Sequence, residues 1–306
     1  MSEGLPPVAE ARIAGLRSSG TWGSALTTDE FAAIRSVGFE PVGQVFGAAV
    51  YSAGTATRYT CPGAGGPPSG GLLPGPPPGP AVRVSGRGGP GSFGPLVQTM
   101  ERTRHTAISR MATECAALGG HGVVGVRLTR GSFPLGGPQF TAIGTAVRGR
   151  GVTQRQPAPF TAEMSGQDFA KLMMTGWVPA GLVLGISIGS RHDDRTTTRQ
   201  ARWGSGNAEV AGWTELVSQS RHDARRQLES DVKRLGADGV VIATMEMKVR
   251  ERDCPETAGR RDHIVEATFI GTAIARFARA GQRHDRPALA VMSLDPQRRQ
   301  AARIRI

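Results

Sequence analysis

Residues 118–128 read LGGHGVVGVRL, and residues 235–245 repeat them as LGADGVVIATM. In both places a Leu-Gly pair that can end a helix is followed by a valine-rich run typical of a strand. Two more segments recur in the same order: VGFEPVGQVFG (37–47) returns as TGWVPAGLVLG (175–185), and TAIGTAV (141–147) returns as TFIGTAI (268–274). Each half of the chain is therefore predicted to be one copy of the same folding unit.

A short helix is predicted at the start of each copy. Thr27 and Glu30 have the S/T-x-x-E spacing of a capping box, and Ser165 and Asp168 repeat that spacing. A glycine follows each helix, where a left-handed residue costs glycine least. The same entry signal thus opens both copies.

A strand, a long helix and two further strands are predicted to follow in each copy. Strand one is expected over residues 42–51 and 181–188, which mix apolar residues with glycine. The long helix is expected over about 96–118 and 214–235, because apolar residues recur there every three to four positions. The third strand most simply pairs antiparallel with the second. Each copy is therefore a β-α-β-β unit.

The domain boundaries follow from this order. We expect an N-terminal helical extension over residues 1–25, a first repeat over 26–150, a second repeat over 151–280 and a basic tail over 281–306. The first repeat contains a Pro/Gly tract at about 57–95 that the second lacks. Such a composition cannot bury enough apolar surface to offset its ordering entropy, so the tract is predicted to be disordered.

The net charge of +12 does not by itself indicate nucleic-acid binding. Only three of the 37 basic residues are lysines. Such a strong bias toward arginine is what an arginine-rich genome composition produces, so the positive charge is weak evidence of function. The excess lies in tails and loops, with no interleaved aromatic residues that would favour RNA. Contact with an anionic partner stays open beside a solvated tail, through Arg298, Arg299, Arg303 and Arg305.

The composition predicts a cytoplasmic, non-enzymatic protein with reduced thiols. The N-terminus lacks a basic start followed by an apolar run, and no stretch approaches the roughly 18 apolar residues of a membrane span. The three cysteines form no CxxC pair. No G-x-S-x-G elbow, P-loop or H-E-x-x-H motif is present, so neither a catalytic residue nor a cofactor site is expected.

One group of metal-ligating side chains is predicted to converge at one end of the second copy. If its first two strands run parallel, four places meet at this end: the end of strand one, the start of the long helix, the loop between strands two and three, and the start of strand three. These places hold His192, Asp193, Asp194, His222, Asp223, Cys254 and His263. Such donors suit Zn, Cu or Ni. The spacing matches no recognised metal motif, so solvated polar loops remain the alternative.

Cys115 aligns with an apolar position, Val232, and is predicted to be a core residue.

The long helix and the strand after it resemble the YbjQ family, which is described as a putative heavy-metal-binding domain. The resemblance is carried by Arg104, Ala107, Ile108, Arg110, Met111, Glu114, Leu118, Gly119 and 123–127. The strand-one signature GFxPVGxVxG matches residues 38–47 and, more loosely, 176–185, so the resemblance covers both copies. It implies a dodecin-like subunit, with an antiparallel three-stranded sheet in the order 1-3-2 backed by one helix. It also implies ring-shaped, often pentameric assemblies. The expected fold class is α+β, with two tandem β-α-β-β units, each behind a short leading helix.

Three functions remain open from the sequence. The first is a self-assembling structural or scaffolding protein that forms a homo-oligomeric ring or cage, because a three-stranded sheet with one helix leaves an edge and a face to cover. The others are a heavy-metal-binding or metal-buffering protein and, by analogy of fold alone, a small-ligand binder. A five-unit ring cannot close from whole chains that each contribute two units. Five chains would have to stack two rings, or three chains would form a six-unit ring.

Overall fold

The computed structural model describes residues 6–20, 23–52, 82–87, 93–132, 137–151, 158–201, 206–254 and 259–277. The predicted basic tail, with the four arginines named above, lies outside the described residues. No helix within the described ranges is long and apolar enough to cross a membrane.

The first half of the chain forms one sheet and its helices. Its elements are α1 (Pro7–Ser19), α2 (Thr28–Ser36), β1 (Phe39–Val50), β2 (Val82–Val84), the short 3-10 helix η2 (Ser85–Arg87), α3 (Gly94–Ala117), β3 (Gly122–Ser132) and β4 (Pro138–Gly149). We call β1, α3, β3 and β4 unit 1. Its strand order is β1-β4-β3, with both pairs antiparallel.

The second half repeats this arrangement. Its elements are β5 (Phe160–Thr161), α4 (Gly166–Met174), β6 (Trp177–His192), α5 (Arg195–Gln200), α6 (Ala211–Arg234), β7 (Gly239–Asp253) and β8 (Arg261–Arg276). We call β6, α6, β7 and β8 unit 2. Its strand order is β6-β8-β7, again antiparallel. The predicted α+β class and the strand order 1-3-2 are confirmed in both units.

The helix signals read from the sequence are confirmed. Thr27 accepts a hydrogen bond from Glu30 N and completes a capping box at the start of α2. Ser165 accepts the equivalent bond from Asp168 N at the start of α4. Gly38 follows the first of these helices with a φ of 84°. That left-handed conformation strains any residue with a Cβ, which explains a glycine at this position.

Two short strands cross between the halves. Strand β2 pairs antiparallel with β6, and β5 pairs parallel with β3. Sheet A is therefore β1-β4-β3-β5, and sheet B is β2-β6-β8-β7. Each half of the chain thus supplies one edge of the other half's sheet.

The prediction of disorder over residues 57–95 is wrong at its C-terminal end. Val82 and Val84 are almost fully buried on β2, and their side chains pack with Leu216 of α6. The carboxylate of Asp223 accepts a hydrogen bond from Gly86 N at 2.9 Å, which holds η2 against α6. Alternating valines favour a strand once a neighbouring edge is available, and the sequence pattern alone did not reveal that edge. The tract before β2 lies outside the described residues.

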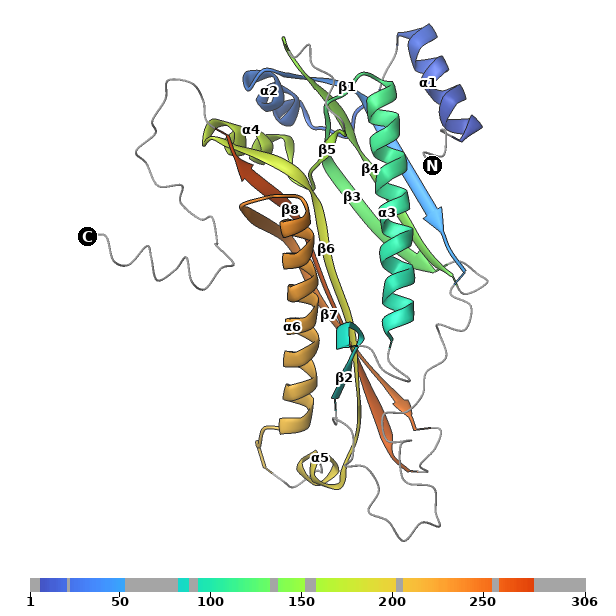
Figure 1. The fold of residues 1–306 in the computed structure, drawn as a ribbon, viewed down its shortest axis with the longest axis vertical. Coiled ribbons are helices and arrows are strands. Elements are labelled where there is room, and N and C mark those ends of the chain that lie inside the picture. Colours follow the sequence, from blue (N-terminus) through green and yellow to red (C-terminus); the bar gives the residue numbers. More distant parts are fainter. Residues whose placement is uncertain are drawn as a thin grey trace, which may run out of the picture.

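Helix α3 lies between the two sheets, and α6 covers the outer face of sheet B. Met111 and Cys115 of α3 pack with Val45 and Val123 of sheet A, and with Leu182 of sheet B. On sheet B the side chains alternate, so one face contacts α3 and the other contacts α6. Figure 1 shows α3 and α6 as two long helices, each running beside the strands of its own unit. The layers are therefore sheet A, α3, sheet B and α6.

Each long helix approaches its sheet at a glycine. A Cβ built on Gly47 would lie 2.0 Å from Ala107 O of α3, and one built on Gly185 would lie 1.9 Å from Ala224 O of α6. No side chain fits in that space, so the helix backbone rests directly on the strand. The two glycines and the two alanines occupy equivalent positions in the two units. The repeated glycines of strand one are therefore required by this close contact.

Gly185→Ala is expected to lower the free energy of unfolding by at least about 2 kcal/mol, because the new methyl group forces α6 away from β6. Chemical denaturation followed by circular dichroism measures this. Gly15→Ala is the matched control, since a Cβ at Gly15 has nothing within 4 Å. An unchanged midpoint for Gly185→Ala would show that the helix and strand are not held in contact.

Candidate functional site

The predicted metal ligands gather mainly at one end of sheet B. Strand β6 ends at His192, β7 ends at Asp253, and β8 begins at Arg261, so these three strand ends meet. The connection from β6 to β7 through α6 makes these two strands run in the same direction, as the convergence required. In Figure 1 this is the end of the molecule where α5 lies.

Strand alternation separates the predicted ligands onto two faces. His192 is paired with Asp262 across the β6–β8 ladder, and Arg191 is paired with His263. Consecutive residues of a strand point to opposite faces, while paired residues share one. His192 and His263 therefore belong to two different clusters.

The first cluster joins imidazole, thiol and carboxylate. Nδ1 of His192 lies 2.7 Å from Oδ1 of Asp262. Cys254 lies beside them, and one ligand atom from each of the three residues falls within 4.8 Å of the others. Asp262 is fully buried, Cys254 is 7% exposed, and His192 is partly exposed. We call these three residues the His-Cys-Asp cluster.

The second cluster is a chain of hydrogen bonds. The two ring nitrogens of His263 each lie 3.1 Å from a carboxylate oxygen, Oδ1 of Asp193 and Oε1 of Glu251. Trp213 Nε1 donates to the same Asp193 oxygen at 3.1 Å, and its ring lies 4.6 Å from that of His263. The hydrogen bond with His263, and a second one from Arg261, lower the pKa of Glu251. Both nitrogens of His263 are thus engaged within the protein, so this cluster ties strands β7 and β8 to α6.

The other predicted ligands have separate roles. Asp194 caps α5 by accepting a hydrogen bond from Thr197 N at 2.7 Å, and this bond lowers its pKa. His222 is exposed on α6 and is absent from the His-Cys-Asp cluster. Asp223 is buried and holds η2, as described above. Cys115 is fully buried in the core, where desolvation raises its pKa to about 12.

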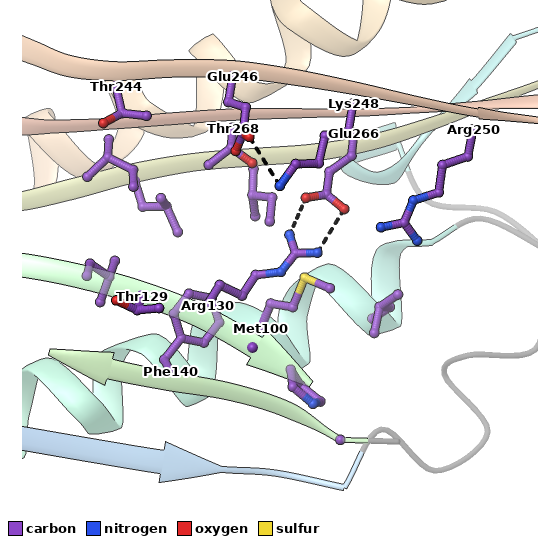
Figure 2. A pocket seen from close by; sticks show the side chains of 18 residues that line it. Met100, Thr129, Arg130, Phe140, Thr244, Glu246, Lys248, Arg250, Glu266 and Thr268 are labelled. Atoms are coloured by element: carbon purple, nitrogen blue, oxygen red, sulfur yellow. Dashed lines mark hydrogen bonds and ion pairs between the residues drawn. The ribbon is translucent and has the colours of Figure 1, made fainter. Parts of the chain in front are cut away.

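A groove of about 640 Å³ lies where the β3–β4 end of sheet A faces sheet B. Figure 2 shows Arg130 of β3 reaching across it to Glu266 of β8, with two hydrogen bonds between guanidinium and carboxylate. Lys248 pairs with Glu246 at 3.2 Å on the same wall. This groove is a candidate surface for the small-ligand hypothesis. The Arg130–Glu266 ion pair spans the groove and joins the two sheets, whereas Lys248 and Glu246 both belong to β7.

Strand β7 carries a row of exposed apolar side chains. Met245, Met247 and Val249 are 58%, 40% and 59% exposed, and β7 is an edge strand of sheet B. Met245 and Met247 are paired with Phe269 and Ala267 of β8, which pack against α6, so the row lies on the α6 side of the sheet. We call these three side chains the β7 row. An exposed apolar row on a sheet edge is typical of a surface that binds another protein.

Sequence reasoning missed three of the residues that build these clusters. Asp262, Glu251 and Trp213 were not among the predicted ligands. Asp262 could have been found, because it precedes His263 at the start of the predicted third strand and must point to the opposite face. The contact of Trp213 with His263 depends on where α6 crosses the sheet, which no local pattern shows.

Comparison with known proteins gives two matches. Residues 88–150 match the family model YbjQ, described as "Putative heavy-metal-binding". This region covers α3, β3 and β4 of unit 1 and contains no member of the His-Cys-Asp cluster. A relative, the encapsulin nanocompartment protein Rv1762c of Mycobacterium tuberculosis (strain ATCC 25618 / H37Rv), is 31% identical over 249 residues, which cover 78% of this chain and 82% of the relative. The relative is more than 30% identical over most of both chains, and the chain therefore belongs to the same protein family as the encapsulin nanocompartment protein Rv1762c.

Proposed function

We propose that the protein is a self-assembling, non-catalytic structural protein whose tandem units build a ring or cage. The observation that carries this proposal is the β7 row. Three large apolar side chains on one edge strand remain 40–59% exposed in the described part of the chain. Burying them against another protein would contribute roughly 1 kcal/mol or more each, and assembly gives them that partner.

The family relationship supports the same role. The relative's printed name assigns it to a nanocompartment, which is an assembly of protein chains. A non-catalytic role is consistent with the candidate sites, in which the acidic and basic groups pair with one another. The proposed location is the cytoplasm, as the composition predicts.

Sedimentation velocity of the full chain tests this proposal. We expect a single species whose mass is a multiple of the 32.1 kDa chain and which persists on dilution through the micromolar range. Native mass spectrometry gives the number of chains. A monomer at every concentration would contradict the proposal, whatever surface is responsible for assembly.

A second candidate function is transition-metal binding at the His-Cys-Asp cluster. Imidazole, thiolate and carboxylate are the donors that zinc prefers, and with a thiolate the set also suits copper. Zn–S and Zn–N bonds of about 2.3 and 2.0 Å place two ligand atoms roughly 3.3–3.6 Å apart at a tetrahedral angle. The 4.8 Å spread of the three ligand atoms would therefore close by about 1 Å around an ion.

Titration of the purified protein with Co²⁺ tests the metal site. We expect one ion per chain, with a thiolate-to-cobalt absorption band that Cys254→Ser removes and His192→Ala weakens strongly. Cys61→Ser is the matched control and should leave the band unchanged. Binding without this band, or a band that survives in Cys254→Ser, would rule out the cluster as the site.

A further inference from the structure

The contact between the two units inside one chain is a model for a contact between chains. On sheet B, the side chains that face α3 are buried by it: Leu182, Leu184, Ile186 and Ile188 of β6 are 8%, 3%, 1% and 4% exposed. Met100 and Val97 of α3 pack on Ile186 and Ile188. The helix side of unit 1 thus rests on the free face of unit 2. Each buried Leu or Ile side chain contributes roughly 1.5–3 kcal/mol, so this contact is strong.

Part of the equivalent face of sheet A has no cover from the described residues, beyond the end where Leu26, α2 and α4 pack on Val124 and Val147. The β1–β4 ladder and the β6–β8 ladder have matching registers. In the first, Phe46 pairs with Ile143; in the second, the equivalent residue Leu184 pairs with Ile270. A bulge interrupts both ladders at the equivalent position. The positions equivalent to the four buried residues are therefore Gln44, Phe46, Ala48 and Val50. Phe46 is 37% exposed and Val50 is 46% exposed. We call these four residues, with Thr141 and Ile143 of β4, the open face of sheet A.

The surface that would complement this open face is also exposed. The helix side of a unit is the face of its sheet that carries the long helix. In unit 1 this side also includes Leu128 and Arg130 of β3, which contact sheet B, where Arg130 pairs with Glu266. Their equivalents in unit 2 are Met245 and Met247 of the β7 row. On α6, the equivalent of Met100 is Val217, which is partly exposed. Among the described residues, one chain therefore presents both exposed side chains on the open face of sheet A and exposed apolar side chains on the helix side of unit 2, beside the part of α6 that packs on β2.

We propose that a second copy of this chain seats its unit 2 helix side, namely α6 and the β7 row, on the open face of sheet A. The contact repeats between chains the contact that unit 1 makes with sheet B within a chain. It deepens the proposed self-assembly and rests on it. Because the two surfaces differ, the contact is head-to-tail, and successive chains extend the stack until it closes. A ring of this kind contains an even number of units.

Charge complementarity supports this occupant. In the intrachain contact, Arg104 of α3 reaches Asp231 of α6 at 3.1 Å. The equivalent residues for an interchain contact are Arg221, which is exposed on α6, and Glu114, which is almost fully buried on α3. In the single chain, Glu114 pairs with Arg12 of α1. Phe46 N donates to the same carboxylate at 2.7 Å, so Arg221 of a second copy would take the place that Arg12 occupies in the single chain.

Two double variants of the full chain test the proposal by sedimentation velocity. Phe46→Arg with Val50→Arg places charge on the open face, and Met245→Arg with Met247→Arg places charge on the β7 row. Each is expected to raise the concentration at which the assembly dissociates at least about tenfold, because a charge buried without a partner opposes association. All four positions are exposed, so the thermal unfolding of the monomer should change little. Met174→Arg is the matched control, since Met174 is an exposed apolar residue of α4 away from both surfaces.

Mixing the two double variants distinguishes a head-to-tail contact from other contacts. The first variant retains an intact β7 row and the second an intact open face, so the mixture is expected to form a dimer of one chain of each and nothing larger. A mixture that stays monomeric, or a first variant that assembles like the wild type, would overturn this inference. In the latter case self-assembly would stand and only its surface would be wrong. A wild-type monomer would instead overturn the proposed function itself.

Discussion

The direct contact between a helix backbone and a strand glycine is the constraint on which the rest of the structure depends. At Gly47 and Gly185 the space for a Cβ is filled by the carbonyl groups of Ala107 and Ala224. This contact fixes how far each helix lies from its sheet, so the strand residues on either side of the glycine can also reach the helix. It leaves the opposite face of each sheet without any cover from its own unit. In sheet B, unit 1 covers that second face.

The second face of sheet B is covered within the chain, while part of the second face of sheet A is exposed in the described part of the chain. Unit 1 lies over the second face of sheet B, whose Leu and Ile side chains are consequently buried. At the same positions sheet A carries Gln44, Phe46, Ala48 and a partly exposed Val50. The two halves thus share a fold and differ in their environment. That difference has a direction, because unit 1 lies on unit 2 and nothing equivalent to unit 1 lies on sheet A among the described residues. In the assembly that we propose, a fused pair of units is one step of a longer head-to-tail series.

Much of the fold could be predicted from local sequence, because helix caps, glycines at helix ends and valine-rich strands act over a few residues. The capping box at Thr27 and the antiparallel pairing of the second and third strands are examples, whereas the strand order 1-3-2 was implied by the family resemblance. Strand β2 could not be predicted, because its three residues form a strand only beside the edge of β6. Most candidate ligands lie near one end of sheet B, as the strand directions predict, but His192 and His263 lie on opposite faces. Their separation follows from strand register, and the register depends on residues far apart in the chain.

The most direct measurement is a single-particle electron-microscopy map of the assembled protein at a resolution that traces its strands. We expect α6 and β7 of one chain to lie on the open face of sheet A of the next. Their relative orientation should be the one that α3 and β3 adopt on sheet B. A map in which the open faces of two chains pack against each other about a two-fold axis would contradict head-to-tail assembly. So would a map in which Phe46 remains exposed to solvent in the assembled particle.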